Sequence, residues 1–507
     1  MKFRGIIPAL FLCAISCTPA AYEFEELYKD LPFDMPRVYR PEIKDTRVSL
    51  SDFGGVPDGV TLNTEAFASA IEALSERGGG HLDVPDGIWL SGPISFRSGI
   101  DLHLSEGALV VFSDDPSLYP VKDLNFEGLD TRRCQSLIEA FDCHDISITG
   151  AGVIEGSGDT WRELRRDKVN PVIWRKALES GRGVLSDDGS RLYPDEGFKL
   201  AATSPHTFNV PTVALDEEVI KRFLRPVLIG FQNCENVLLE GCTFQNSPSW
   251  NLHPVFCKNL IVKDIFVKAP DYSQNGDGID IDACENTIVV DSSFDVGDDA
   301  VCVKSGKNED GRRRGIPTKN LIVSGCTVYH GHGGFVVGSE MSGGVCNVKV
   351  SRCRYLGTEL GLRFKSCRGR GGVVENIWIE DILMKDIMSD AIIFNLIYNG
   401  TSAFSRISNG ESGFAGLEPM PVDETTPEFR NINIKGVNCS GAESAMNFFG
   451  LPEKPVKGIS VSDSHFCTKK GASFAYSRDI VLSNVSIDNS EGEKISAFDT
   501  ENLRCDE

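Results

Sequence analysis

The chain has 507 residues, of which 41% are hydrophobic and 24% are charged, and it carries a formal net charge of -22 at pH 7. This composition is that of a globular protein, and the length bounds the number of domains only loosely, because all-β folds often exceed the usual domain size. The negative charge argues against nucleic acid and anionic lipid as partners, since a phosphate backbone needs a basic surface. An anionic substrate would have to meet a local cluster of cations.

The first residues have the features of an export signal. Two basic residues precede an apolar run from 6 to 15, which is too short to span a bilayer, so residues 1–17 are interpreted as a signal peptide. The sequence Ala14-Ile15-Ser16-Cys17 resembles a bacterial lipoprotein processing site, with Cys17 as the lipidated residue, whereas a signal of the Ala-x-Ala type would lie around 18–21. We therefore expect an exported protein: a periplasmic or outer-membrane lipoprotein of a bacterium, or a secreted protein. This anchor would be its only contact with a membrane.

A lead-in and one helix come next. Residues 18–45 are rich in proline and show no hydrophobic periodicity, which predicts an extended segment. Over residues 64–77, apolar side chains recur with helical spacing from Phe67 to Leu74, and a run of glycines then ends the pattern. This is the best-formed helix in the sequence, and we expect it to cover one end of the structure that follows.

From about residue 80 onward a short unit recurs, in which an Asn, Asp or Gly precedes alternating Ile, Val or Leu. Between Asn236 and Asn376 successive copies start roughly 23–34 residues apart, a period that indicates a solenoid. Because the unit contains no helix and is too short for a four-stranded blade, we predict an all-β fold, a right-handed single-stranded parallel β-helix. The leading Asn would lie at a tight turn. The copies begin at Asp145, Asn236, Asn259, Asn286, Asn320, Asn347, Asn376, Asn431, Gly458 and Asp479.

The cysteines follow the same repeat. An exported chain with sixteen cysteines is compatible with a disulfide framework, but repeated placement in register favours stacked, buried thiols. No CxxC pair with zinc-binding spacing is present. The cysteines in equivalent places are Cys234, Cys242, Cys257, Cys284, Cys302, Cys326 and Cys353.

Two segments interrupt the period, at about 160–222 and at about 397–428. Insertions in a solenoid form loops, often on the binding side, so we expect both segments to be walls of a cleft. We therefore assign residues 46–500 to a single β-helix domain with two insertions. We expect this domain to be monomeric.

The most unusual stretch runs from Asn275 to Lys307, where aspartates alternate with Ile, Val and Cys at strand spacing. Neighbouring carboxylates in a poorly solvated place cannot all stay ionised, so at least one of them should keep a proton at a raised pKa. That is the condition for general acid and general base catalysis by the same residue type.

Equivalent positions of successive coils line up on one face of a β-helix. Such an alignment gathers three carboxylates, one imidazole and two cations into one surface patch, which we take as the candidate site. Four short motifs from successive coils form this patch: Asn275 with Asp277, Asp298 with Asp299, His332 between two glycines, and Arg363 with Lys365.

These four motifs resemble the four signatures of glycoside hydrolase family 28, the polygalacturonases: Asn-x-Asp, Gly-Asp-Asp, Gly-His-Gly and Arg-x-Lys, in that order. Further stretches are similar to the family as well, among them Lys304-Ser-Gly-Lys307, and the likeness extends over about 45–390. The resemblance implies hydrolysis of α-1,4-galacturonosyl linkages in a pectic polysaccharide or oligogalacturonide, with no cofactor and no metal.

The resemblance also implies a role for each residue. Asp298 would be the general acid that protonates the leaving oxygen, while Asp277 and Asp299 position and deprotonate the attacking water, with inversion. His332 would adjust the protonation of Asp298. Six residues are candidates for substrate binding. For two of them, Trp250 and His253, a buried structural role is the alternative. The full set is Asn275, Arg363, Lys365, Lys304, Trp250 and His253.

Alternatives remain open for the position of cleavage along the polymer and for the class of reaction. The two insertions, and the similarity of 250–254 and 338–344 to bacterial members that cut at chain ends, favour exo action; an endo-polygalacturonase or a rhamnogalacturonan-type hydrolase is the alternative. A calcium-dependent pectate lyase would use the aspartates as metal ligands, but the stretch after Asn275 fails the EF-hand pattern. A non-catalytic polysaccharide-binding β-helix would leave the converging groups without a purpose.

Overall fold

The computed structural model of the protein describes residues 22–207, 210–398 and 417–506. The chain forms two compact units, residues 1–32 and residues 33–507. The described part of the first unit contains the short helix α1 (Glu25–Tyr28). The predicted signal peptide and Cys17 lie outside the described residues. Within the described ranges, every helix is too short or too polar to cross a membrane.

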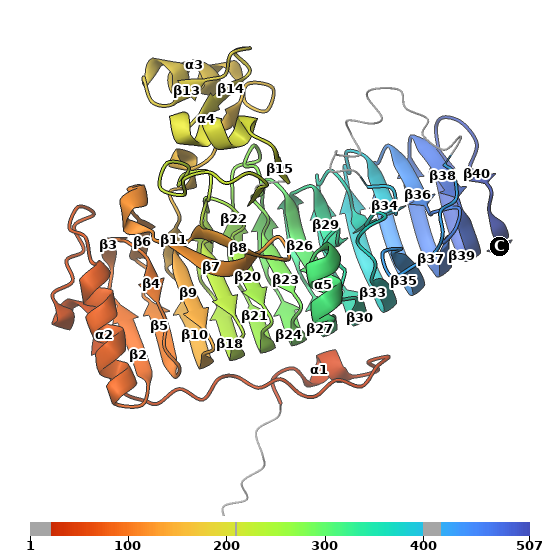
Figure 1. The fold of residues 1–507 in the computed structure, drawn as a ribbon. Helices are drawn as coiled ribbons and strands as arrows, with labels where there is room; N and C mark the ends of the chain where they lie inside the picture. The colour runs from red at the N-terminus through yellow and green to blue at the C-terminus, as the bar shows by residue number, and fades with distance from the viewer. Residues whose placement is uncertain (1–21, 208–209, 399–416, 507) are drawn as a thin grey trace, which may run out of the picture. The chain divides into compact units, whose positions relative to one another are not determined.

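The second unit is a parallel β-helix, as predicted, in which three ladders of parallel strands run along the stack of coils (Figure 1). One ladder is a twelve-stranded sheet, which we call the site sheet. Its strands are β4 (Ile94–Ser95), β9 (Ile138–Phe141), β17 (Ile229–Gln232), β20 (Leu252–Val255), β23 (Ile279–Asp282), β26 (Asp299–Lys304), β29 (Gly333–Val337), β32 (Leu362–Lys365), β34 (Asp390–Asn395), β36 (Ser444–Phe449), β38 (Lys470–Ala475) and β40 (Ile495–Phe498).

The other two ladders belong to one 22-stranded sheet. The first ladder contains β1 (Arg47–Ser49), β2 (Gly80–Val84), β5 (Ile100–Leu104), β10 (His144–Gly150), β18 (Glu235–Glu240), β21 (Lys258–Lys263), β24 (Glu285–Val290), β27 (Thr318–Ser324) and β30 (Val345–Ser351). The second contains β3 (Gly87–Ser91), β6 (Ala108–Phe112), β11 (Val153–Glu155), β19 (Thr243–Gln245), β22 (Phe266–Lys268), β25 (Ser293–Asp295), β28 (Thr327–His330) and β31 (Arg354–Leu356).

The two ladders merge in the later coils, because β30 and β31 both pair with the single 13-residue strand β33. Side chains of β33 alternate between buried and more exposed positions, as expected for a strand with one face on the core. The strands from this point on are β33 (Val373–Lys385), β35 (Glu428–Ser440), β37 (Val456–Thr468), β39 (Ser477–Asn489) and β41 (Glu501–Asp506).

The interior is a continuous apolar column, because equivalent positions of successive coils carry similar side chains. In the site sheet, the rings of Phe364 and Phe394 stack with centroids 4.4 Å apart, and the column continues through Phe448 at 4.7 Å and Phe474 at 5.0 Å. Aromatic pairs at such distances add to the stability that burial of their area already provides. This column fixes the register of one coil on the next, since a slip of one residue would turn every inward side chain outward.

The prediction that the leading Asn lies at a tight turn is wrong: from Asn236 to Asn347 each of these residues lies inside a strand, near its start, and together they form a ladder of side chains. Asn236, Asn259, Asn286, Asn320 and Asn347 all have φ between 56° and 60°, a left-handed conformation that Asn tolerates better than most residues. Each side-chain amide donates to the carbonyl oxygen of the Asn one coil earlier, at 3.0–3.2 Å from Asn259 to Asn347. The short polar side chain therefore fits both the backbone and its neighbours.

All described cysteines are free, and the prediction of buried thiols is confirmed for the seven cysteines in equivalent places. Cys234, Cys257 and Cys284 each lie two residues before an Asn of the ladder and are fully buried or nearly so. Each thiol also lies within 3.6 Å of a backbone carbonyl of the preceding coil. The cysteines therefore fill the corner of the coil as small apolar side chains.

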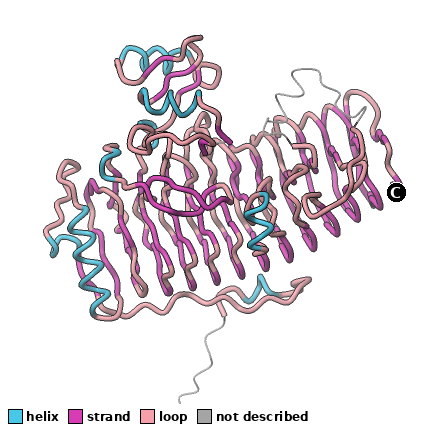
Figure 2. Tube along the Cα trace, in the orientation of Figure 1, coloured by secondary structure: helices cyan, strands magenta, loops and turns pink. Residues whose placement is uncertain are grey.

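The predicted helix is α2 (Thr64–Glu76), one residue shorter than expected, and it covers the first coils (Figures 1 and 2). It buries Phe67, Ala70, Ile71 and Leu74 and packs against β2 and the 3-10 helix η1 (Leu50–Phe53). Asn63 precedes the helix, but its side chain binds Val56 and Leu90 and does not cap it.

The first insertion is more ordered than the predicted loop. It holds two helices and a small three-stranded antiparallel sheet, and Figure 2 shows these helices away from the stacked strands. Its elements are η3 (Gly158–Thr160), β12 (Leu164–Arg165), α3 (Pro171–Glu179), β13 (Val184–Leu185), β14 (Arg191–Tyr193), α4 (Glu196–Thr203), β15 (His206–Thr207) and β16 (Val210–Pro211). Most of the second predicted insertion, residues 399–416, lies outside the described residues.

Two further elaborations gave no periodic signal in the sequence. One is an antiparallel hairpin of β7 (Val121–Phe126) and β8 (Leu129–Cys134), which follows the 3-10 helix η2 (Pro116–Leu118). The other is the helix α5 (Asn308–Arg314), which lies directly after β26 and packs on β8. Both cover part of the outer face of the site sheet, where the side chains of strands β20 to β26 are buried.

Candidate active site

Neighbouring strands of the site sheet bring the predicted catalytic residues together at their N-terminal ends. Asp277 lies two residues before β23, Asp298 directly precedes β26, and His332 directly precedes β29. Asp299 opens β26 and pairs in register with Gly333, the residue after His332. Parallel stacking thus places residues that are far apart in the sequence on one short stretch of the sheet.

The three aspartates form one compact cluster. A carboxylate oxygen from each of Asp277, Asp298 and Asp299 lies within 4.8 Å of the others. The separation that usually distinguishes glycosidases is about 5–5.5 Å for retaining enzymes and about 6.5–9.5 Å for inverting ones. By that rule alone the cluster would be assigned to a retaining enzyme, in disagreement with the inversion expected from the sequence.

His332 lies between two carboxylates. Its Nδ1 is 3.0 Å from Oδ1 of Asp298, and its Nε2 is 3.7 Å from Oε2 of Glu359. Burial works against the charged form of the imidazole, but the charges of Asp298 and Glu359 and the hydrogen bond to Asp298 outweigh it, so the pKa of His332 is raised. Burial likewise opposes ionisation of Asp298, yet the charge of His332 and its hydrogen bond lower the pKa of this carboxyl. The pair therefore holds one proton between them.

Asp299 is kept ionised by two cations. Its Oδ1 accepts from Nη1 of Arg363 at 3.1 Å, and its Oδ2 accepts from Nζ of Lys365 at 2.6 Å. Burial favours the neutral acid, but the charges of Lys365 and Arg363 lower the pKa of Asp299. Arg363 and Lys365 are only 5% and 7% exposed, so their principal partner is this carboxylate.

Asp277 has the opposite environment. Burial raises its pKa well above the ordinary value, and the charges of Asp280 and Asp298 act in the same direction. Its Oδ1 has no hydrogen-bond partner in the described part of the chain, whereas its backbone carbonyl accepts two hydrogen bonds from Asn251. The sequence-based expectation that one aspartate of this stretch retains a proton fits Asp277 best among the three.

Lys304 does not face the substrate, contrary to prediction. It is 3% exposed, and its Nζ lies 3.4 Å from Oδ1 of Asp280 and 3.1 Å from Oε2 of Glu340. Burial raises the pKa of Asp280 to about 8, an effect that the charge of Lys304 only partly offsets. Arg370 also contacts Glu340, at 3.4 Å. These residues form a buried charge network beneath the aspartate cluster.

Trp250 and His253 take the structural alternative, so the prediction that they bind substrate is corrected. The Trp250 ring is 2% exposed and is covered by Phe126 of the β7–β8 hairpin, at 4.6 Å between ring centroids, and by Nζ of Lys304, 4.6 Å from its centroid. His253 is equally buried, and its Nε2 lies 3.6 Å from Asp282. No face of either ring is open to a sugar, because the hairpin closes over them.

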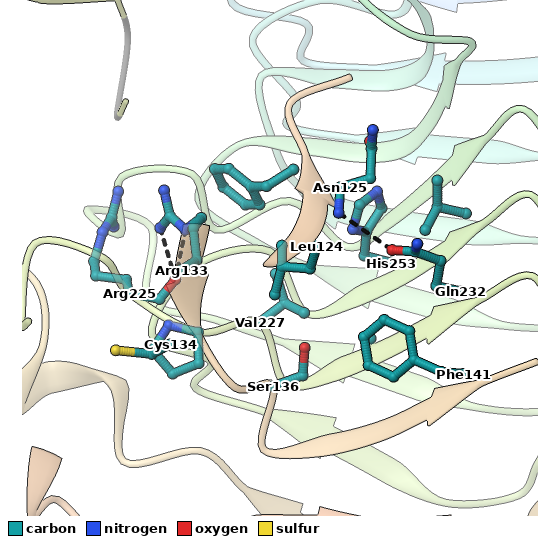
Figure 3. Close-up of a pocket in the computed structure, with 14 residues that line it drawn as sticks. Leu124, Asn125, Arg133, Cys134, Ser136, Phe141, Arg225, Val227, Gln232 and His253 are labelled. Carbon is teal, nitrogen blue, oxygen red and sulfur yellow. Dashed lines mark hydrogen bonds between the residues drawn. The ribbon is translucent and has the colours of Figure 1, made fainter. Parts of the chain in front are cut away.

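Asn275 is held by a buried arginine. Its Oδ1 accepts from Nη2 of Arg225 at 2.8 Å, and Nη1 of the same guanidinium donates to the backbone carbonyl of Gln274 at 2.9 Å. Arg225 is in turn fixed by β8, because Nη2 of Arg133 donates to its carbonyl oxygen at 2.6 Å (Figure 3). The chain segment that carries Asp277 is therefore braced from the hairpin.

The small cavity of Figure 3 lies under this hairpin, between Leu124, Ser136, Phe141 and Val227. Its volume of about 20 Å³ suffices for one water molecule and is far too small for a sugar ring. The cavity belongs to the brace around Arg225 and is not a substrate site.

Two functional candidates were missed by sequence reasoning. One is Glu359, described above, and the other is Tyr398, which follows β34 at the start of the second insertion. The Tyr398 ring lies under both cations, 5.6 Å from the guanidinium of Arg363 and 5.3 Å from Nζ of Lys365, and it is partly exposed. Its position just after a strand of the site sheet was the available signal, because strand ends of a β-helix carry the functional residues.

Two cavities are lined by residues of the first insertion. One, of about 320 Å³, is lined by Tyr193, Phe198 and Phe223 together with Arg225 and Gln274, the residues that flank Asn275. The other, of about 620 Å³, lies between α3 and the loop that contains Tyr272. The insertion therefore lies next to the segment that carries Asn275.

Comparison with known proteins identifies the family. A family model described as "Glycosyl hydrolases family 28" matches residues 220–409, which include every residue of the aspartate cluster and both cations. A protein of Vitis vinifera named "Probable polygalacturonase" is 32% identical over 426 residues, which cover 82% of this chain and 73% of that protein. The chain belongs to glycosyl hydrolase family 28. The predicted family is thus confirmed, and with it the prediction of a glycoside hydrolase of the polygalacturonase type.

Two further relatives of this family 28 chain carry a narrower name. A crystal structure titled as a hyperthermoactive exopolygalacturonase from Thermotoga maritima is 32% identical, with a TM-score of 0.72, and the match covers 90% of this chain and 95% of that one. The "Exo-poly-alpha-D-galacturonosidase" of Dickeya chrysanthemi is 26% identical over 420 residues, which cover 81% of this chain and 65% of that protein. The family 28 fold of the chain agrees with the solved structure over nearly its whole length.

Proposed function

We propose that this family 28 hydrolase cleaves α-1,4-galacturonosyl linkages of polygalacturonate from the end of the chain, by a single displacement with inversion. The observation that supports this best is the aspartate cluster, in which two cations lower the pKa of Asp299, burial raises the pKa of Asp277, and Asp298 is hydrogen-bonded to an imidazole. Two groups of different protonation state are what acid and base catalysis at one linkage requires.

Asp298 and His332 together act as the general acid. His332 holds the proton of the pair at rest, and the proton passes through the 3.0 Å hydrogen bond to Asp298 as this carboxyl protonates the leaving oxygen. Asp299 is the general base, because Arg363 and Lys365 keep it ionised. Asp277, whose pKa is raised by burial, orients the attacking water.

The substrate carboxylate meets the same two cations. Arg offers five N–H donors and Lys three, and Asp299 takes one from each, so donors remain for an incoming galacturonate. Tyr398 lies against both cations with part of its ring exposed and adds a surface for the sugar. This arrangement lets an acidic chain bind an acidic polymer at one local point.

Exo action is supported by the first insertion and by the names of the relatives. A cavity that Tyr193 and Phe198 of the insertion line together with Arg225, the residue that holds Asn275, puts the insertion next to the segment that carries Asn275. The Thermotoga maritima and Dickeya chrysanthemi proteins are both named for exo-acting enzymes. A wall at one end of a cleft admits a chain terminus and excludes internal segments.

Timed product analysis on homogalacturonan tests this proposal. Exo hydrolysis releases short saturated products of one fixed size from the first minutes, and a chelator leaves the rate unchanged. A ladder of oligomers at early times would overturn exo action. Unsaturated products that vanish with a chelator would overturn hydrolysis in favour of the calcium-dependent lyase.

The export route is a separate part of the proposal. We propose that the N-terminal signal exports the chain and that Cys17 carries a lipid anchor, on the basis of the Ala14-Ile15-Ser16-Cys17 sequence. In a bacterial host the unaltered precursor should fractionate with membranes, and Cys17→Ser should release it into the soluble fraction. Equal fractionation of both forms would favour simple secretion.

A further inference from the structure

A second cluster of potential ligands lies on the outer face of the last coils, on the 22-stranded sheet and not on the site sheet. His465 and Cys467 are two residues apart on β37 and therefore point to the same side. The next strand, β39, places Ser486 in register with His465 and Asp488 in register with Cys467. None of these residues has a part in the proposed hydrolysis.

The ligand atoms of this cluster are close enough for one ion. Nε2 of His465 is 3.2 Å from Sγ of Cys467 and 3.9 Å from Oδ2 of Asp488, and all three atoms lie within 4.8 Å of one another. Tetrahedral zinc with ordinary bond lengths separates N and S ligands by about 3.6 Å and N and O ligands by about 3.4 Å. Shifts of a few tenths of an ångström in side chains would thus suffice.

The histidine is already oriented as a ligand. Its Nδ1 forms a hydrogen bond with Oγ of Ser486, so that Nε2 faces Cys467 and Asp488. Histidines that bind metals usually donate their other ring N–H to a neighbouring oxygen, which fixes both the tautomer and the ring. Ser486 therefore supplies the outer contact that a histidine ligand needs.

The cluster can be reached from solvent. The side chains of His465 and Asp488 are 43% and 64% exposed, and a shallow hollow lined by Cys467, Asp488 and Lys494 lies beside them. An ion can therefore enter without rearrangement of the coil, and water can complete the coordination.

We propose that His465, Cys467 and Asp488 bind one zinc ion, with water in the fourth position. A set of one imidazole, one thiolate and one carboxylate suits zinc and other borderline divalent ions, whereas calcium and magnesium require oxygen ligands. The ion joins β37 to β39 by ligands from both strands. It therefore stabilises the terminal coils, which have fewer neighbouring strands than the middle of the stack.

Equilibrium dialysis of the full chain against Zn²⁺ alone is the direct test. The chain should bind one equivalent more than Cys467→Ser or His465→Ala, and Zn²⁺ should raise the thermal midpoint of the unaltered chain more than that of either variant. Co²⁺ in place of Zn²⁺ should give the absorption of a thiolate ligand, which Cys467→Ser removes. Ser486→Ala should weaken the binding about 10–100-fold.

Cys346→Ser is the matched control, because Cys346 is another partly exposed thiol on the same sheet, in β30, away from the cluster. This variant should keep the additional equivalent of Zn²⁺ and the thiolate absorption. The proposal is overturned if Cys467→Ser and His465→Ala bind as much Zn²⁺ as the unaltered chain, or if Cys346→Ser loses binding to the same extent. Hydrolysis of polygalacturonate should be the same in all these variants, which separates this test from that of the proposed function.

Discussion

Glu359 is the residue through which the proton of the Asp298–His332 pair can be adjusted. Its Oε2 faces Nε2 of His332 at 3.7 Å, on the side of the ring away from Asp298. The negative charge of Glu359 contributes to the raised pKa of His332. Glu359 does not reach the aspartate cluster directly, and we regard it as a positioning residue.

Glu359→Gln should lower the pKa of His332, because the imidazolium loses one of the charges that favour it. The pair then loses its proton at a lower pH, and the alkaline limb of the kcat/KM profile moves toward lower pH. The measurement is the pH dependence of kcat/KM on polygalacturonate. Asp295→Asn is the control, since Asp295 pairs with the exposed His330 at 2.7 Å, outside the cluster. An unmoved alkaline limb in Glu359→Gln would contradict the assigned role.

The environment of the three aspartates predicts inversion at the anomeric carbon. Carboxylate oxygens of the three aspartates lie within 4.8 Å of one another, closer than the separation that is usual for an inverting enzyme. However, none of the three carboxylates is free to attack the sugar. Asp299 is bound by two cations and Asp298 by His332, while burial raises the pKa of Asp277. Proton NMR during the first turnovers should therefore detect the β-anomer from the α-linked substrate. The α-anomer as first product would indicate a covalent intermediate instead.

The sequence predicted which candidate residues lie close together, for a physical reason. In a β-helix the position along the repeat determines the face and the height in the stack, so Asp298, His332 and Arg363 could be brought together without coordinates of any kind. The burial of Lys304 and Trp250 could not be predicted in this way. It depends on a hairpin and on charge pairs whose members carry no periodic signal.

The Asn ladder holds each coil in register with the next. Asn286 accepts from Asn320 and donates to Asn259, at 3.0 and 3.2 Å, while its φ is 59°. Asn286→Ala loses both hydrogen bonds and keeps an unfavourable conformation, so it should reduce the free energy of unfolding by about 2–4 kcal/mol. Asn286→Gly loses the hydrogen bonds alone and should cost less. Thermal or denaturant unfolding measures both, and equal stability of Asn286→Ala and the unaltered chain would contradict the role of the ladder.

The repeated elements of the fold could be predicted from the sequence, whereas the elements that occur once could not. The repeat predicted the parallel β-helix and the buried thiols, because each coil needs the same residues at the same places. The β7–β8 hairpin and the helices α3 and α4 are single structures that interrupt the repeat. Only a break in the period marks them, so their position was predictable and their content was not.

At the scale of the whole molecule, charge is the main obstacle to binding. A chain of net charge -22 repels polygalacturonate at long range, while Arg363 and Lys365 attract it only at short range. Raising the salt concentration from about 10 mM to about 150 mM shortens the screening length from about 30 Å to about 8 Å. The KM for the polymer should therefore fall over this range, with a smaller change for trigalacturonate. A KM that rises with salt would mean that local attraction dominates.

In the proposed mechanism the stacked coils assemble one acid catalyst from Asp298 and its neighbours, and Asp298→Asn removes that acid. This variant keeps the shape of the side chain but cannot protonate the leaving oxygen, so kcat on polygalacturonate should fall about 10²–10⁴-fold with little change in thermal midpoint. Asp295→Asn, three residues away and paired with His330 outside the cluster, should keep full activity. If Asp298→Asn hydrolyses polygalacturonate as fast as Asp295→Asn does, the site lies elsewhere.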